Sequence, residues 1–391
     1  MKTGEHVRDG QERDEVTELR VGVVADPGVP ARVAGWLARG ELAEALEASV
    51  SRAARWQVEV AREKLPLDEN GMIPITELGR QRRERNGWDV VVYLTDLPRW
   101  TSAQPVVADI STSHSVGQIS LPAVGWVRLR PHVRDTLVHV VRRLAGAQPH
   151  LLPDASAIRD AEHAAAGRRV LPRRPTELVS PVRETASALP GIDLSLELVG
   201  LRGRSRLLFG MVRDNRPWRL VPHLKSATAA AAATAAFGIF YYTIWGMAEA
   251  LPAWRLALIT VLAIAAMATW LLAYNHLWER PVGKYTPAEV ALYNASTVLT
   301  LLLGVTCMYG ILYVVALGAA AVVIDGGYLQ SKIGHPASAA DYATLVWLAS
   351  SMGIVAGALG SSLDTEEAVR EAAYSRREQE RQAHLRARRS P

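Results

Sequence analysis

The chain has 391 residues and a formal net charge of +5, and 49% of its residues are hydrophobic. This length is enough for two or three domains, and the modest charge, without any nucleic-acid-binding signature, argues against a nucleic-acid partner. The single cysteine, Cys307, excludes an intramolecular disulfide framework.

The N-terminal third alternates strand and helix patterns. Residues 1–18 lack the apolar stretch of a cleavable signal peptide, and we expect them to be disordered. The alternation over 19–147 predicts a cytoplasmic α/β domain with a partly parallel sheet. Predicted strands cover 19–24, 56–66, 89–98, 105–111 and 116–122, and predicted helices cover 29–54, 75–87 and 131–146.

A Rossmann-like domain is the usual interpretation of such alternation. The loop after the first strand reads ADPGVPARV, with the single glycine Gly28 and two prolines. It is not the G-x-G-x-x-G turn that holds a pyrophosphate, and the chain has no Walker A lysine. We therefore expect no cofactor and assign no cofactor-binding residue.

A second pattern runs from residue 56 to residue 150. VVVYLTDLP ends in a Thr95-Asp96 turn, QISLP gives a short strand, and LVHVVRRLAGAQPH places His139 seven residues before Gly146. This order resembles the archaemetzincin-like zinc proteases over roughly 90 residues. The resemblance implies a zincin-like fold, with His139 in the place of the first zinc ligand and Gly146 in that of the turn glycine.

The same helix departs from the zinc-protease motif at each further position. Val140 stands in the place of the catalytic Glu, Arg143 in that of the second ligand and Pro149 in that of the third, with His150 one place late. Zinc hydrolysis needs two imidazoles one helical turn apart and a Glu that activates the bound water. We therefore predict a pseudoenzyme domain, with no catalytic residue and no metal ligand.

Other polar residues have ordinary structural explanations. The segment STSHS (Ser111 to Ser115) surrounds His114 with serines, but neighbours in sequence rarely have triad geometry, and a polar turn is expected. Asp96 and Asp109 lie near strand ends, where turn-forming carboxylates are commoner than ligand-binding ones.

The prolines of residues 148–199 predict a tether with a short helix near 154–166.

The pattern of residues 200–225 predicts a basic juxtamembrane helix, because apolar residues recur at helical spacing between arginines. This pattern is typical of a helix bound to anionic lipid, although a polar linker with stop-transfer charges is the alternative. The arginines in question are Arg202, Arg204, Arg206 and Arg213.

Residues 226–363 predict an all-α transmembrane unit of four helices. Four segments reach the roughly 20 apolar residues that a bilayer requires. Thr286 and Pro287 give the third helix an N-cap and a first-turn proline. GIVAG (Gly353 to Gly357) is a small-residue face for packing within the chain or, alternatively, for a homo-oligomer. The segments are 226–248, 253–274, 298–324 and 342–363.

Basic residues give the orientation. Arginines and lysines precede the first segment, lie between the second and third at Arg280 and Lys284, and fill the charged tail helix 364–391, which includes Arg377 and Arg381. We expect the tail to be a solvated helix that continues the fourth segment; an interaction arm for an acidic partner is the alternative. The opposite loops carry only Arg255 and Lys332. The positive-inside rule therefore predicts a multi-pass protein of the cell inner (plasma) membrane with both termini cytoplasmic.

The chain also resembles uncharacterised four-span membrane proteins of high-GC actinobacteria, through LRGRSRLLFGMVRDNRPWRLVP and its composition rich in Ala and Arg. That resemblance implies no activity. The sequence favours a non-catalytic cytoplasmic domain acting in binding, sensing or scaffolding, with a protein partner that it does not identify. The alternatives are a transporter or channel component, which the absence of charge from the middle of the spans disfavours, and a membrane-attached enzyme acting through the α/β domain.

Overall fold

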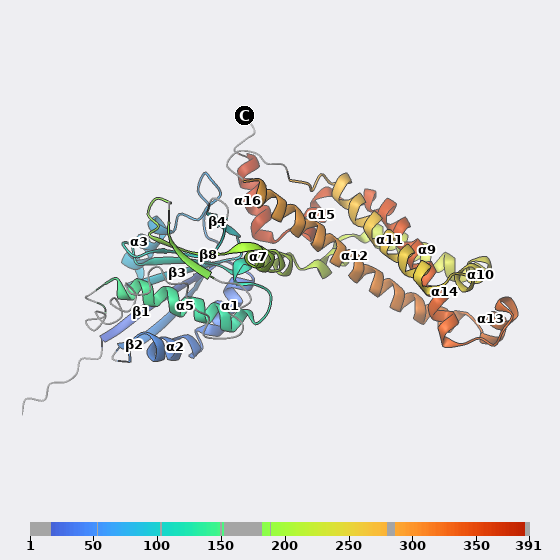
Figure 1. The fold of residues 1–391 in the computed structure, drawn as a ribbon, viewed down its shortest axis with the longest axis horizontal. Coiled ribbons are helices and arrows are strands. Elements are labelled where there is room, and N and C mark those ends of the chain that lie inside the picture. Colours follow the sequence, from blue (N-terminus) through green and yellow to red (C-terminus); the bar gives the residue numbers. More distant parts are fainter. Residues whose placement is uncertain are drawn as a thin grey trace, which may run out of the picture.

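The protein is described by a computed structural model that covers residues 17–52, 54–101, 104–148, 151, 182–187, 189–279 and 286–387. An α/β domain (17–198) is followed by a helical unit (225–363), and Figure 1 shows the two at opposite ends of an elongated molecule. The predicted order of a mixed α/β domain before an apolar helical region is confirmed.

The α/β domain is built on one eight-stranded sheet in the order β2-β1-β3-β6-β5-β8-β7, with β4 paired to β5. The first four strands in this order are parallel, and β5, β8 and β7 continue the sheet antiparallel. The strands are β1 (Thr17–Ala25), β2 (Ala54–Arg62), β3 (Val90–Thr95), β4 (Arg99–Thr101), β5 (Gln104–Ser111), β6 (Val116–Ser120), β7 (Val182–Ala186) and β8 (Leu194–Leu198).

The predicted tether is wrong at its C-terminal end, since 182–198 supplies two strands. Leu196 and Leu198 are buried, and Ser195 donates a hydrogen bond to Asp109 of β5 at 2.7 Å. Gly191, at φ 75°, forms part of the turn between the two strands. Proline content concealed these strands, because it marks turns without excluding short strands between them. The predicted helix at 154–166 lies outside the described residues.

Helices cover both faces of the sheet (Figure 1). On one face lie α1 (Val29–Leu37), α2 (Glu41–Ser49) and α5 (Leu129–Gly146), over the larger apolar core, and on the other lies α3 (Ile75–Asn86). The predicted helix 29–54 is divided into α1 and α2 because Gly40 adopts φ 119°, which a continuous helix excludes.

Three helices of the helical unit are long and apolar enough to cross a membrane: α11 (Ala253–Tyr274), α12 (Pro287–Val323) and α14 (Ala339–Gly360, extended to Leu363 by a 3-10 turn). The first predicted span is a bent pair instead, α9 (Lys225–Phe240) and α10 (Tyr242–Ala250), which meet at 87°. The pair is a fourth candidate only if it counts as one span. A short helix, α13 (Gly326–Ile333), precedes α14.

Small residues allow α9 and α14 to approach closely. A Cβ added to Gly353 would stand 2.6 Å from the carbonyl oxygen of Ala231, and one added to Gly357 would stand 3.0 Å from that of Ala227. The GIVAG face therefore packs within the chain, which is the first of the two predicted roles.

Two segments connect the domain to the helical unit. The first is α7 (Gly200–Asn215) with the 3-10 turn η1 (Pro217–Arg219) and α8 (Leu220–His223), and it packs on α4 (Leu121–Val124) and on α12. The second is the tail, α15 (Glu366–Ala373) and α16 (Arg376–Ala387). The tail does not continue α14 as one helix, because the backbone is extended at Asp364 and again at Tyr374.

Candidate functional site

The carboxyl ends of the parallel strands form the candidate site. In open α/β sheets this edge is the usual place for a ligand, because adjacent connections leave a crevice there. Here β1 is followed by Asp26, β3 ends at Thr95, and β6 ends at Ser120, and all three side chains are buried. Figure 1 shows the tail helix α16 and helix α7 at the side of the domain that meets the helical unit.

Asp26 lies at this edge of the sheet, and we call the buried region of Asp26, Leu65 and Thr95 the crevice. Its Oδ2 accepts a 2.6 Å hydrogen bond from the hydroxyl of Thr95, and its Oδ1 accepts a 3.0 Å bond from the backbone N–H of Leu65. Burial raises the pKa of this carboxyl, whereas the bonds from Thr95 and Leu65 and the charge of Arg377 act in the opposite direction. The partners of Asp26 therefore favour the charged form of its carboxyl, against the cost of burial.

Arg377 reaches Asp26 from the tail, more than three hundred residues along the chain. Its Nε lies 3.3 Å from Asp26 Oδ2, and the two side chains are 5% and 1% exposed. The same guanidinium donates to the carbonyl of Leu65 and, at 3.1 Å, to Glu380. The segment that follows the last apolar helix thus occupies the crevice of the sheet.

Asn215, the last residue of α7, joins three parts of the molecule. Its amide donates to the hydroxyl of Thr300 in α12 at 3.0 Å, and its carbonyl accepts from the backbone of Ser375 in the tail at 2.9 Å. Beside it, Asp214 is paired to Arg213, with the closest N–O distance at 2.8 Å. Because these groups are buried, their bonds fix how α7, α12 and the tail lie relative to each other.

The tail is also bonded to the start of α12 and the end of α11. Arg381 donates to the hydroxyl of Tyr293 and to Glu378, each at 2.8 Å. Tyr374 donates to the carbonyl of Leu277 at 2.9 Å. We call this set of contacts, from Asp26 to Tyr293, the junction.

Several carboxyl groups of the junction are shifted toward their neutral form. Burial, reinforced by Asp214 and Asp26, raises the pKa of Asp96 to about 8. Burial raises the pKa of Asp214 to about 6, and burial with the nearby Glu378 raises that of Glu279 to about 7. Asp96, Asp214 and Glu378 line a cavity of about 20 Å³, which is room for one water molecule.

His139, the residue singled out by the zinc-protease resemblance, lies among arginines. Its Nδ1 is 3.1 Å from Arg142, and burial together with Arg142 and Arg143 lowers its pKa to about 4. Val140 is a core residue that packs on Gly117, and Arg143 is paired with Glu184 of β7. Pro149 and His150 lie outside the described residues. Within the described ranges, no three His, Cys, Asp or Glu side chains are placed to hold a metal ion.

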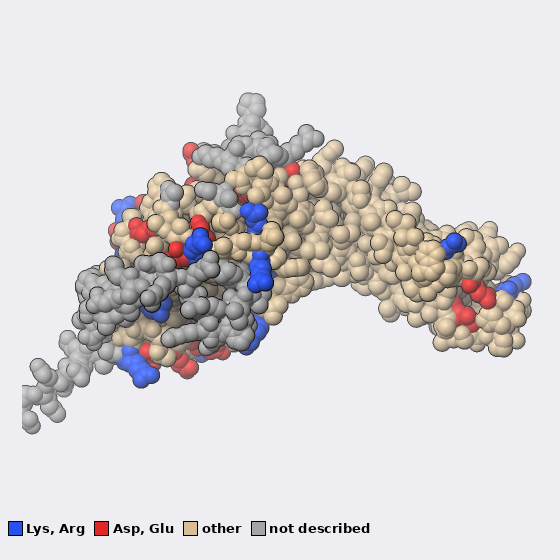
Figure 2. All heavy atoms as spheres, in the orientation of Figure 1, with Lys and Arg blue, Asp and Glu red and all other residues tan. Residues whose placement is uncertain are grey.

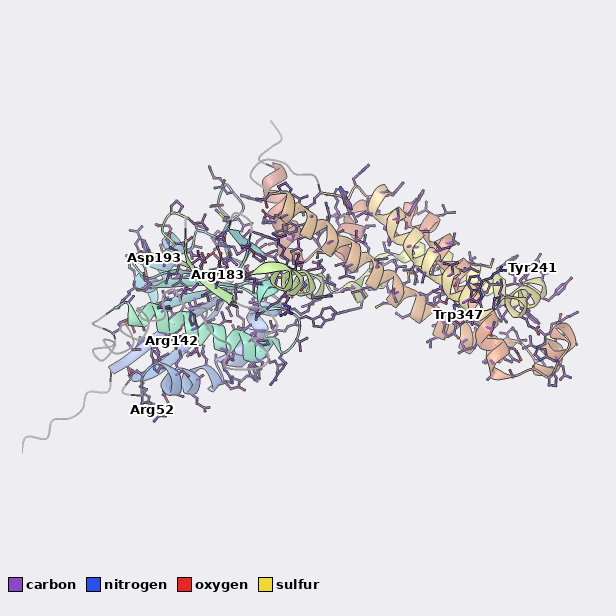
Figure 3. All side chains as sticks on the ribbon, in the orientation of Figure 1. Arg52, Arg142, Arg183, Asp193, Tyr241 and Trp347 are labelled. Carbon is purple, nitrogen blue, oxygen red and sulfur yellow. The ribbon has the colours of Figure 1, made fainter. Side chains whose placement is uncertain are left out.

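The remaining candidates have structural roles. His114 Nδ1 lies 2.9 Å from Ser111 and 3.0 Å from Ser113 in a turn, as predicted, and Asp193 accepts from the backbone of this turn. Figure 3 shows Asp193 on the domain, at the end remote from the helical unit. Asp109 of the buried strand β5 pairs with Arg99 of the partly exposed strand β4 at 2.7 Å.

Helix α7 does not present all four of its predicted lipid-binding arginines. Arg206 donates to the carbonyl of Val124 at 2.8 and 2.9 Å, and Arg213 donates to that of Gly125. These two guanidinium groups hold α7 on α4, while Arg202 is exposed and Arg204 is half-buried. The sequence had no signal for this, because the carbonyl groups that they bind belong to a turn about eighty residues earlier.

The chain was compared with protein-family models, with curated proteins and with solved structures, and none of these matches it. The geometry of the junction is therefore the basis for the functional conclusion.

Proposed function

We propose that the chain is a non-enzymatic integral membrane protein whose cytoplasmic α/β domain is coupled to a four-helix membrane unit through the tail. The domain acts in binding, sensing or scaffolding, and its partner enters the crevice by displacing Arg377. The observation that carries this proposal is the burial of Arg377 against Asp26.

The position of Arg377 makes the two halves interdependent. A ligand at the carboxyl ends of the strands must compete with its guanidinium for Asp26. The tail that carries it is bonded at Tyr374 to Leu277, next to α11, and at Ser375 to α7. Displacement of the tail therefore perturbs the ends of the apolar helices, and movement of those helices changes access to the crevice.

The proposed topology counts the bent pair α9–α10 as one span and places both termini in the cytoplasm. It is supported by the excess of arginine and lysine in the sequence before the first span, between the second and third spans and after the fourth. Alkaline phosphatase fused near Arg255 or Lys332 should be active, and a fusion at residue 391 should be silent. Activity at residue 391 would overturn this topology.

The coupling is tested by removing the tail after Tyr374 in the full-length protein in nanodiscs. Amide hydrogen exchange should accelerate at 63–68 and 94–98, around the crevice, and also in the first turns of α12, which the truncation leaves intact. Deletion of only 388–391 is the matched control, because it keeps Arg377 in place.

Two results would contradict the proposal. If exchange accelerates only around the crevice, the tail covers the domain without coupling it to the helices. If the truncated protein gains a hydrolytic activity that the intact protein lacks, the crevice is an inhibited active site, and the membrane-attached enzyme becomes the better explanation.

A further inference from the structure

A groove on the α/β domain is lined by arginines and apolar side chains. It has a volume of about 570 Å³ and lies between the first turn of α1 and the start of α5. Its charged lining residues are Arg32, Arg128 and Arg130, and its apolar ones are Val29, Val33, Leu129 and Pro131.

The three arginines have no acidic partner among the described residues. None of them forms an ion pair within the described ranges, and Arg130 instead lies over the ring of Trp36, 4.9 Å from its centroid. Burial is the largest cause that lowers the pKa of Arg216, and repulsion from the charges of Arg32 and Arg219 lowers it further. A groove with uncompensated guanidinium groups fits a phosphate, which arginine binds through paired N–H donors.

Exposed apolar side chains stand next to the groove. Trp126 and Val127, which immediately precede Arg128, are 48% and 70% exposed, and Trp218 is 59% exposed. The Trp126 ring packs edge-on against the half-exposed Phe209 of α7, with 6.0 Å between centroids. Aromatic and aliphatic side chains exposed beside arginines are the composition of a surface that enters a headgroup layer.

This surface is continuous with the apolar helices. The turn η1, which carries Trp218, packs on α12, where a Cβ added to Gly304 would stand 2.9 Å from the carbonyl of Pro217. Figure 2 shows lysine and arginine atoms on the domain along its boundary with the helical unit, whose middle carries no charged atoms on this face. An uncharged belt bordered by arginine is what a bilayer and its headgroups require.

We propose that the groove of Arg32, Arg128 and Arg130 binds the phosphate headgroup of an anionic phospholipid while Trp126 and Val127 enter the bilayer surface. This inference rests on the proposed membrane placement and deepens it. The binding site orients the domain on the membrane.

The first test measures phosphatidylglycerol bound to the detergent-solubilised full-length protein by native mass spectrometry. Arg32→Gln, Arg128→Gln and Arg130→Gln together should weaken one lipid site about 125-fold, since each basic residue near an anionic surface contributes roughly fivefold. The matched control replaces Arg39, Arg52 and Arg55, three exposed arginines elsewhere on the domain, with Gln. Figure 3 shows Arg52 on the side of the domain away from the helical unit.

The second test leaves the arginines intact. A nitroxide at Val127→Cys, in a Cys307→Ser background, should become protected from a water-soluble nickel complex in nanodiscs that contain phosphatidylglycerol. It should stay accessible in phosphatidylcholine alone or when the three arginines are replaced. A nitroxide at Arg52→Cys should stay accessible in every bilayer.

The inference is overturned if the triple variant and its control retain phosphatidylglycerol equally, or if phosphatidylcholine is retained as well as phosphatidylglycerol. It is also overturned if inorganic phosphate binds as tightly as the lipid, since Trp126 and Val127 would then contribute nothing. These outcomes leave the proposed function standing. A wild-type chain that is found in the soluble fraction would refute the proposed function itself.

Discussion

Replacing Arg377 with Met tests whether the tail is held in the crevice by charge. The substitution keeps an unbranched apolar side chain of similar length but removes the ion pair with Asp26 and the hydrogen bond to the carbonyl of Leu65. Asp26, at 1% exposure, then keeps only its bonds from Thr95 and from the backbone of Leu65. Without Arg377, the buried carboxylate has lost the one cation that forms an ion pair with it among the described residues.

The expected cost follows from the burial of both partners. Removing one member of a buried ion pair costs about 3 to 5 kcal/mol. At 1.36 kcal/mol per factor of ten, this raises the equilibrium constant for displacement of the tail from the crevice by roughly 150-fold to several thousandfold. The double variant Asp26→Asn/Arg377→Met removes both charges and keeps a side-chain oxygen that can accept from Thr95 or Leu65. It should recover much of the loss, because the cost of the single variant comes mainly from leaving one buried charge unpaired.

Hydrogen exchange of peptides covering 63–68 and 94–98 measures this opening in the full-length protein. The control is Arg80→Met, which breaks a pair with Glu77 at 3.0 Å whose side chains are 62% and 55% exposed. Such a surface pair contributes about 0 to 1 kcal/mol. If Arg377→Met and Arg80→Met change protection by the same factor, the inference that the buried pair holds the tail is wrong.

The loss in Arg377→Met should also depend on pH. Burial already raises the pKa of Asp26, and removal of Arg377, which lowers it, moves it further upward. A carboxyl whose folded pKa lies above its unfolded value destabilises the fold as pH rises from the unfolded pKa to the folded one. Acidification through the folded pKa should therefore restore protection in the variant more than in the wild type, and a loss independent of pH would contradict this assignment.

Three further predictions concern other parts of the molecule. Gly353→Ala places a Cβ 2.6 Å from the carbonyl of Ala231 and should lower the unfolding midpoint in detergent by several degrees, about 1 to 3 kcal/mol, whereas Gly310→Ala, with nothing within 4 Å, should not. Burial raises the pKa of Asp96 to about 8, so its ionisation should destabilise the wild type between roughly pH 4 and pH 8, and the dependence of stability on pH should be flatter in Asp96→Asn. The full-length protein should carry well under one zinc per chain by atomic emission, and His139→Ala should change neither that content nor stability beyond about 1 kcal/mol.

The sequence predicted the elements whose pattern is local. The strands near 19–24, 89–98 and 116–122 are short apolar runs, and each was found within a few residues of its predicted bounds. The start of α12 was also predicted correctly, because Thr286 accepts from the backbone of Glu289 at 3.3 Å as an N-cap does. These features are decided by neighbours within four or five positions, so a single sequence is enough.

The features that the sequence did not predict depend on distant partners. From the sequence, we used Arg377 and Arg381 only to predict the orientation of the membrane helices, and we expected both to be solvated. In the structure, Arg377 is among the most buried charged residues. Nothing in the pattern of the tail distinguishes an arginine that faces Asp26 from one that faces water. The bend between α9 and α10 was missed for a related reason, since apolar composition alone does not determine where a helix turns.

The charged composition of the junction indicates its function. Buried ion pairs contribute little net stability, because desolvation of both ions offsets most of their attraction. A junction selected only for strength would be apolar, whereas this one contains Asp26, Asp214 and Glu378, each paired with an arginine. Such groups fix one docked arrangement and make it sensitive to any cation that competes for Asp26.

A partner that competes with Arg377 for Asp26 must meet a measurable requirement on its binding free energy. To raise the fraction of molecules with a displaced tail from about 1% to 99%, a ligand must bind the displaced state more tightly than the docked state by about 5.5 kcal/mol. A ligand that binds both states equally leaves the equilibrium unchanged. A group that takes over the role of Arg377 must be cationic, must bind the carboxylate of Asp26 and must accept burial beside Thr95. Guanidinium-bearing peptides meet these conditions better than lysine-bearing ones, because a planar guanidinium tolerates desolvation and binds a carboxylate through two parallel donors.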